Sequence, residues 1–433
     1  MPRRFVSTNP VVLVPVVVAL CGAVALAAIY ARGYARGEPI RADGVGYYIY
    51  LPALFLDHDL TLVRTVDRSF GGNPQSAGEL RPVEHGYLGP HQIGEAILLA
   101  PFFAAAQLVS VADGAPRNGF SRPYQGSAAA GGLLYGVAGL AFLGSFLRRW
   151  FGPWTVGFTL LALTFGTNLF HYLTFDAVYS HAFSFAVVAF VLWVTVRLAE
   201  RATALRALLL GLGLGAAVTI RPTSGVVVLF PLLVGVSSAA DARARGRALL
   251  ARPGLLAAAA AGFLVPVIPQ LLYWHHLTGR FLVDAYGSEP RLELAHPHLL
   301  AVAFSVRKGL FFWTPLVALG LLGLPFLRNR TPALLLATSS VLAVNFWIVA
   351  SWSQWWYGGS FGQRAFVDSL PVFAIALAGL FDRVRATRAV VPVTAAVVVA
   401  SCLALHAMAG YWLGRIPYDG TTWPVYLHSF ATP

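Results

Sequence analysis

Two acidic side chains lie beside long apolar segments, where a carboxylate could act on a substrate at a membrane surface. The first, Asp43, opens the stretch RADGVGYYIYLPALFLDHDL (41–60). Tyr47, Tyr48 and Tyr50 follow it, and tyrosine suits the headgroup layer because its ring is apolar and its hydroxyl is polar. Since a low local dielectric raises carboxylate basicity, an acid there could take a proton from a hydroxyl. An ordinary turn or capping role for Asp43 is the alternative interpretation.

The second acid, Asp176, lies in HYLTFDAVYSHAFSF (171–185), directly before an apolar run. His171 and His181 each stand five residues from it, a poor match to the spacing of three or four that defines one helical face. A metal site made of these three residues is therefore not predicted. Two interpretations of Asp176 remain: a polar group brought near Asp43, or the N-cap of the following helix.

Basic side chains form the third candidate group. Arg307 and Lys308 lie in SVRKGLFFWTPL (305–316), and Arg364 lies in SWSQWWYGGSFGQRAFVDSLP (351–371). Arginine and lysine neutralise phosphate, which makes these three residues candidates for binding a phosphorylated substrate. The alternative for Arg307 and Lys308 is snorkelling to lipid headgroups.

Aromatic residues form the fourth group. Trp355, Trp356 and Tyr357 precede a glycine-rich stretch, and with Tyr47 they are candidates for stacking on a sugar ring. An aromatic belt at the membrane surface would explain the tryptophans equally well.

The composition places these residues in a membrane protein. The chain has 433 residues, of which 57% are hydrophobic and only 11% are charged. That charged fraction is roughly half that of a soluble domain. The only cysteines, Cys21 and Cys402, lie in apolar runs, which argues against a disulfide framework or a cysteine metal site.

Eleven apolar runs are long enough, or nearly so, to cross a membrane. They fall at 10–30, 126–147, 152–171, 178–197, 206–220, 223–239, 254–273, 309–327, 332–350, 366–382 and 389–412. The sequence thus predicts an all-α polytopic bundle of about 11 transmembrane helices in a single integral membrane domain (1–433).

The distribution of arginines predicts the topology. Short loops at 148–149, 197–206, 241–252, 328–330 and 383–388 are basic, and the positive-inside rule places them in the cytoplasm. With a cytoplasmic amino terminus, this alternation holds only if 93–112 does not cross. The predicted inner loops then carry a net charge of +13, the whole excess of the chain, so no nucleic-acid partner is required. We therefore expect a first outer loop (31–125) with interfacial helices at about 46–56 and 93–112, and an outer tail at 413–433.

In these residues the chain resembles the GT-C superfamily of multi-spanning glycosyltransferases, which includes protein mannosyltransferases, aminoarabinose transferases and RgtA/B/C/D-like bacterial proteins. The resemblance covers the full length and rests on ADGVGYYIYLPAL, TFDAVYSH, SVRKGLFFWTPL and WYGGSFGQRAFVDSLP. It implies that Asp43 and Asp176 are the two catalytic acids. The family often has a second acid beside the first, but Gly44 stands there, which puts a metal-dependent mechanism in doubt. No cofactor is predicted, and a divalent metal stays open.

The resemblance also implies the partners. The expected donor is a sugar on a polyprenyl phosphate, and the expected acceptor is a lipid-linked saccharide, a glycan or a small lipid. Asp43 would activate the acceptor hydroxyl in an inverting displacement, Arg307, Lys308 and Arg364 would stabilise the leaving phosphate, and Tyr47 and residues 355–357 would cover the sugar. The expected location is the cell (inner) membrane, with the active face and the carboxyl terminus outside.

A polytopic transporter or lipid flippase is the main alternative. Transporters usually place ionisable residues near the membrane midplane and often show matching halves. The apolar runs of this chain are nearly free of ionisable residues, apart from histidines and the Arg221–Pro222 break. The composition therefore favours chemistry at the surface.

Overall fold

The computed structural model describes residues 9–32, 38–287 and 290–431. Within these ranges the chain is helical except for connecting segments and one short antiparallel hairpin, β1 (Arg81–Val83) and β2 (Gly86–Leu88), in which Arg81 pairs with Leu88. The all-helical class predicted from the sequence is confirmed.

The described helices follow one another along the chain, interrupted only by the hairpin and connecting segments. Their bounds are α1 Pro10–Arg32, α2 Asp43–Tyr48, α3 Tyr50–Pro52, η1 Ala53–Asp57, α4 Val63–Phe70, α5 Gly94–Asp113, α6 Arg122–Leu147, α7 Pro153–Phe165, α8 Leu169–Thr174, α9 His181–Glu200, α10 Ala204–Ile220, η2 Pro222–Val228, α11 Leu229–Leu233, α12 Ala239–Leu250, α13 Pro253–Thr278, α14 Leu299–Phe304, α15 Leu310–Trp313, α16 Pro315–Leu321, α17 Leu324–Arg330, α18 Pro332–Ala350, η3 Arg364–Ser369, α19 Leu370–Val384, α20 Val390–Trp412 and α21 Trp423–Ala431.

Eight helical segments in the described part of the chain are long and apolar enough to cross a membrane. Seven of them, α1, α6, α9, α13, α18, η3 with α19, and α20, coincide with runs predicted from the sequence. The remaining four predicted runs are short or broken. For example, Pro222 begins a new helix directly after α10, and 309–327 contains the separate helices α15, α16 and the start of α17. A multi-pass membrane protein is thus supported, whereas the predicted count of eleven spans is not established.

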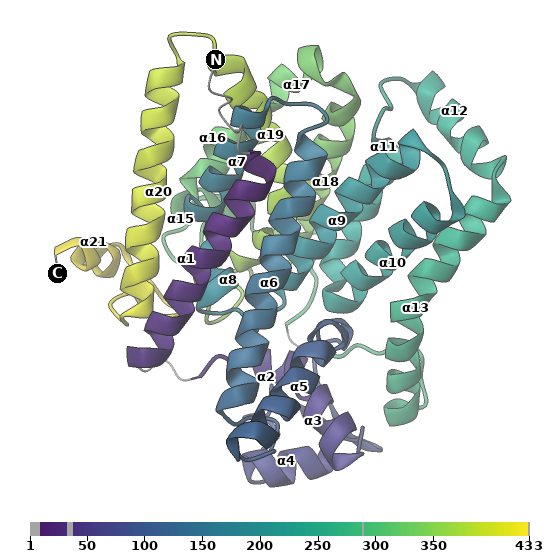
Figure 1. The fold of residues 1–433 in the computed structure, drawn as a ribbon, viewed down its shortest axis with the longest axis vertical. Coiled ribbons are helices and arrows are strands. Elements are labelled where there is room, and N and C mark those ends of the chain that lie inside the picture. The colour runs from purple at the N-terminus through teal and green to yellow at the C-terminus, as the bar shows by residue number, and fades with distance from the viewer. Residues whose placement is uncertain (1–8, 33–37, 288–289, 432–433) are drawn as a thin grey trace, which may run out of the picture.

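The eighth long apolar segment is α5, which the charge pattern predicts not to cross. Figure 1 shows α5 gathered with α2, α3 and α4 at the lower end of the molecule, beside the start of α6. The long helices extend from this end towards the other. The interfacial position of α5 stays a prediction, with which this arrangement agrees.

The tyrosines of the first loop do not face a headgroup layer, contrary to the expectation from their type. Tyr47, Tyr48 and Tyr50 are each at most 5% exposed because α2 and α3 are covered by α5 and neighbouring segments. The Tyr48 hydroxyl donates to the Gly119 carbonyl at 2.8 Å, and the Tyr50 hydroxyl donates to the His91 carbonyl. These tyrosines are therefore buried structural residues of the first loop.

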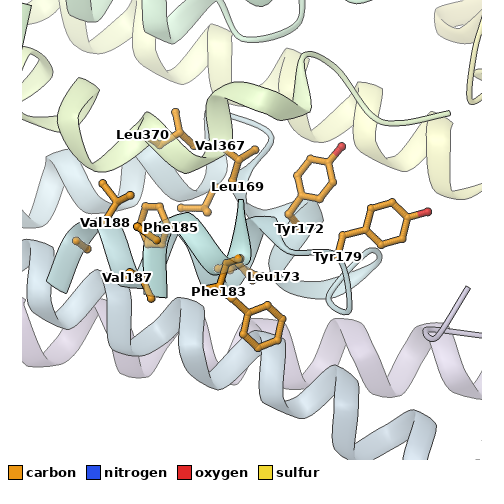
Figure 2. Packing of buried hydrophobic residues seen from close by; sticks show 14 of the residues in the cluster. Leu169, Tyr172, Leu173, Tyr179, Phe183, Phe185, Val187, Val188, Val367 and Leu370 are labelled. Carbon is orange, nitrogen blue, oxygen red and sulfur yellow. The ribbon is translucent and has the colours of Figure 1, made fainter. Parts of the chain in front are cut away.

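Among the long helical segments of the described chain, α9 and η3–α19 are the most deeply buried, and they pack against each other. Figure 2 shows Phe185 and Val188 of α9 near Val367 and Leu370, and all four are buried. Dense packing on both sides fixes the short 3₁₀ helix η3. Its first residue, Arg364, is thereby held in place beneath the first loop.

Close backbone contact joins α10 to α13. A Cβ atom on Gly211 of α10 would overlap the Ala259 carbonyl, and one on Gly262 of α13 would overlap the Leu208 carbonyl. Small residues permit such an approach between apolar helices. The ends of this helix pair, near Ile220 and Trp274, form one wall of the site.

Candidate active site

Asp43 is the first residue of α2 and is partly exposed, with 23% of its side chain accessible. Its Oδ2 atom lies 2.7 Å from Nη1 of Arg364 and 3.9 Å from Nε2 of His91. Burial opposes ionisation, but Arg364 and His91 outweigh it and hold the pKa of Asp43 well below its ordinary value. The expectation from the sequence, that a low local dielectric makes the Asp43 carboxylate more basic, is therefore wrong. Asp43 is also no cap, because the N-cap of α2 is Ala42 and no side chain caps the helix.

Asp176 positions Asp43 through Arg41. Its Oδ1 atom accepts a hydrogen bond from Nη2 of Arg41 at 2.6 Å, and its Oδ2 atom lies 2.7 Å from Nε2 of His171. The indole of Trp412 donates to the other ring nitrogen of His171 at 2.8 Å. The capping alternative is wrong, because Ser180 precedes α9. Asp176 thus anchors the chain two residues before Asp43.

Replacing Asp176 with asparagine is expected to destabilise the fold. The carboxyl is 3% exposed, and removing one charge of a buried pair costs about 3–5 kcal/mol. Burial raises the pKa of Asp176, but Arg41 and His171 outweigh it and lower the pKa to about 2. This stabilisation is therefore present above the ordinary pKa of 3.8 and is lost as the pH falls towards 2. Thermal unfolding in detergent against pH measures both effects; an unchanged midpoint at neutral pH would contradict them.

A second buried network surrounds Asp368 of η3. Its Oδ2 atom lies 2.8 Å from Nε of Arg221, and its Oδ1 atom lies 3.0 Å from Nδ1 of His181. The Ser224 hydroxyl donates to Oδ2 at 3.3 Å, and Nη1 of Arg221 donates to the Ser180 hydroxyl at 3.3 Å. In the sequence, Arg221 is notable only as part of the Arg221–Pro222 break between two apolar runs. An arginine within an apolar stretch was the available signal of a functional position.

A cavity of about 380 Å³ opens beside these networks. It is lined by Tyr47, Pro90, Gln92, Ile220, Arg221, Pro222, Thr223, Trp274, Val283, Asp284, Ala285, Tyr286, Pro290, Arg291, Leu292, Ile348, Trp352 and Tyr357. Asp43 and Tyr47 are four residues apart on α2 and therefore share a face. Asp43 thus lies one helical turn from the wall of an aromatic cavity that contains the guanidinium of Arg221.

The cavity includes only some of the aromatic residues predicted to bind a sugar. Tyr47 and Tyr357 line it, whereas Trp355 and Trp356 are not among its lining residues. Trp356 instead lies under the guanidinium of Arg307, 3.9 Å from the ring centroid. Trp352 takes a place in the lining, with its ring 5.1 Å from that of Tyr286.

Two of the three predicted phosphate-binding cations have protein partners away from the cavity. Arg307 binds Asp419 through two hydrogen bonds of 2.9 Å. Lys308 is 1% exposed, and its ammonium donates to the carbonyls of Ser360 and Tyr418. Only the third, Arg364, lies at Asp43. Lys308 therefore holds the turn that leads into η3.

Replacing Lys308 or Arg307 with a neutral residue is expected to have contrasting effects on stability. Lys308→Met removes the donor to the buried Ser360 carbonyl and should lower the free energy of unfolding by about 1–3 kcal/mol. Arg307→Gln should change it by about 1 kcal/mol or less, because Arg307 and Asp419 are each about a third exposed. Thermal unfolding of both variants in detergent provides the comparison. A larger loss for Arg307→Gln would contradict this assignment.

Some buried polar atoms with no hydrogen-bond partner in the described part of the chain belong to the segment 89–95, of which Pro90 and Gln92 line the cavity. They include Nδ1 of His91 and both carboxyl oxygens of Glu95, which is 0% exposed. Both residues belong to GPHQIGE (89–95), which the sequence marks only as a polar entry to an apolar run. Within the described ranges, no group of three or more His, Cys, Asp or Glu is arranged to hold a metal ion.

The chain was compared with protein-family models, with curated proteins and with solved structures. None of the three comparisons found a match. The geometry of the site therefore carries the functional argument alone.

Proposed function

We propose that the chain is a membrane glycosyltransferase that moves a sugar from a polyprenyl-phosphate donor to a lipid-linked saccharide, a glycan or another acceptor at the outer face of the membrane. One observation carries the proposal: Asp43 lies one helical turn from Tyr47, which lines an aromatic cavity that also contains the guanidinium of Arg221. An acid, a cation and aromatic faces are the groups that transfer from a sugar phosphate requires.

The donor would occupy the cavity. Its volume of about 380 Å³ lies within the usual range for small-molecule sites. The rings of Tyr47, Trp352 and Tyr357 would cover the sugar, and Arg221 would meet the phosphate, whose charge grows as the glycosidic bond breaks. Arg221 thus replaces Arg307 and Lys308 as the main candidate for phosphate binding, and Arg364 contributes positive charge through its pair with Asp43.

Asp43 would orient the acceptor. Because Arg364 keeps the carboxyl ionised, it accepts a hydrogen bond from the acceptor hydroxyl and aims that oxygen at the anomeric carbon. The new carbon–oxygen bond forms as the bond to the phosphate oxygen breaks, and the electron pair leaves with the lipid phosphate. The hydroxyl proton is drawn towards Asp43 and finally rests on the more basic phosphate or in water. Such a single displacement inverts the anomeric configuration.

The proposed topology has eleven membrane passes in a GT-C-like arrangement, with the amino terminus cytoplasmic and the carboxyl terminus outside. The gathering of α2–α5 at one end of the bundle supports an outer face that contains the site. The arginine-rich loops support the cytoplasmic assignment of the other end.

A transporter or lipid flippase is the second candidate. The buried network of Arg221, His181 and Asp368 favours it, because ionisable groups among apolar helices often mark a transport path. Such a protein would move the lipid without cleaving its sugar–phosphate bond.

The deciding experiment uses vesicles that contain the purified protein, a panel of radiolabelled polyprenyl-phosphate hexoses and pentoses, and a membrane lipid extract as acceptor. Sugar that appears on an acceptor supports the glycosyltransferase. If no donor loses its sugar while the intact donor crosses the bilayer faster than in protein-free vesicles, the transporter replaces it.

A further inference from the structure

The helix α12 (Ala239–Leu250) has no buried residue, although it is fully formed. Isolated helices of this length are marginal in water, and most helices in proteins are stabilised by packing of an apolar face. Its N-terminus is capped, since the backbone amide of Asp241 donates to the Ser238 hydroxyl at 3.1 Å. A cap contributes only about 1 kcal/mol. A further surface is therefore needed to stabilise α12.

The position of α12 identifies that surface. The helix ends at Leu250, and the apolar helix α13, which is long enough to cross a membrane, begins three residues later at Pro253. Figure 1 shows α12 at the upper right, at the opposite end of the molecule from α2–α5. A segment this close to the start of a membrane-spanning helix lies at the level of the lipid headgroups.

One face of α12 is apolar and is bordered by arginines. Ala242, Gly246, Leu249 and Leu250 follow helical spacing and share a face, and Leu250 is 78% exposed. Arg243 and Arg247 form an exposed pair, four residues apart, along one border of this face.

Arg245 fixes the orientation of the helix. Its guanidinium donates to the carbonyls of Pro231 at 2.7 Å and Val234 at 3.0 Å, which directs that side of α12 towards the protein. The apolar face and the Arg243–Arg247 border contain no buried residue, and Leu249 and Leu250 are 38% and 78% exposed.

We propose that α12 docks on a bilayer surface containing acidic phospholipids, with its apolar face in the headgroup–acyl boundary and Arg243 and Arg247 bound to lipid phosphates. Apolar burial and attraction to acidic headgroups are the two contributions that hold amphipathic helices on membranes. Asp241, the only acid on α12, already accepts from the Ser237 amide at 3.0 Å at the start of the helix. This docking is independent of any catalytic activity, so it stands or falls separately from the proposed function.

Cysteine accessibility tests the docking directly, because Cys21 and Cys402 are the only native cysteines and can both be replaced by serine. Ala242→Cys and Ala244→Cys form a matched pair. Both alanines are exposed in the protein and lie roughly 200° apart around the helix. Each full-length variant is placed in nanodiscs of phosphatidylcholine, with or without phosphatidylglycerol, and treated with a charged thiol reagent. In acidic nanodiscs, Ala242→Cys is expected to react at least about tenfold more slowly than Ala244→Cys.

The arginines are tested on the same background. Arg243→Gln with Arg247→Gln should weaken docking about thirtyfold, from about 1 kcal/mol for each arginine, and restore labelling of Ala242→Cys. Arg383→Gln with Arg388→Gln, in another basic loop, should leave the labelling ratio unchanged. Equal rates at the two positions in acidic nanodiscs would overturn the docking. If Ala242→Cys is protected equally with and without phosphatidylglycerol, and also after both arginines are replaced, the assignment to acidic lipid would be overturned. Protection found only in native membranes would show that a protein, not lipid, covers α12.

Discussion

Asp43→Asn is expected to lower sugar transfer by about 10²–10⁴-fold, the usual contribution of a positioned acid or base. Asparagine keeps the size of the side chain but loses the charge that pairs with Arg364 at 2.7 Å and that would orient the acceptor hydroxyl in the proposed mechanism. Initial rates of transfer from labelled donor lipid in reconstituted vesicles measure the effect. Donor binding should change far less than the rate, because the proposed sugar and phosphate contacts come from Tyr47, Trp352, Tyr357 and Arg221 rather than from Asp43.

The control for this variant is Asp67→Asn. Asp67 is an exposed acid of the same loop, on α4, and should leave transfer within twofold of wild type, about the resolution of such assays. The thermal midpoints of both variants show whether the protein is still folded. A folded Asp43→Asn protein that transfers sugar at the wild-type rate would remove Asp43 from the mechanism.

The ion pair with Arg364 also determines the pH response. Because the pKa of Asp43 is held well below its ordinary value, the carboxylate is present throughout neutral and mildly acidic solution. Transfer should therefore not lose this group between about pH 7 and pH 5. In Arg364→Gln the burial that opposes ionisation remains while the main opposing charge is gone, so residual activity should fall as the pH is lowered. A steep acidic loss in the wild type, absent from Arg364→Gln, would reverse the assignment.

Arg221→Gln is expected to reduce kcat/KM for the donor lipid by about 10²–10³-fold, the typical loss when a group that stabilises developing charge is removed. Arg221 lines the cavity, whereas Arg307 and Lys308 are bound by Asp419 and by backbone carbonyls. Arg307→Gln should keep most of the activity. Steady-state kinetics over a range of donor concentrations provide the comparison.

Folding must be separated from catalysis at this position. Removing Arg221 leaves the carboxylate of Asp368 buried beside His181, which costs about 3–5 kcal/mol. In the double variant Arg221→Gln with Asp368→Asn no uncompensated charge remains, and most of that stability should return. Activity should stay low in the double variant if Arg221 binds phosphate. Recovery of activity together with stability would show that Arg221 has a structural role only.

The broad architecture could be predicted from hydropathy because burial in lipid requires long apolar helices. Helix breaks could not be located in this way. The run 152–171 is apolar throughout, yet α7 ends at Phe165 and a separate short helix begins at Leu169. Hydropathy reports the environment of a residue and is insensitive to a local change of backbone direction.

The site could be predicted only in part, because its contacts are long-range. Asp43 and Arg364 were each recognisable from type and neighbourhood, but for separate roles, and their pairing depends on how α2 meets η3. His91 and Glu95 gave no signal, since a polar residue at the entry of an apolar run is common. Lys308 gave a misleading signal. A cation at a helix start indicates an anion site, yet its ammonium donates to two carbonyls of the same chain.

The distance along the sequence between Asp43 and its partner Arg364 also affects how the protein is synthesised and assembled. Arg364 follows Asp43 by 321 positions, so the two side chains leave the ribosome about 15–65 s apart at ordinary synthesis rates of about 5–20 residues per second. Throughout that interval the acid is without its main counter-charge and must remain hydrated. Assembly of the Asp43–Arg364 pair is therefore a late step of biogenesis, completed only when η3 packs against α9.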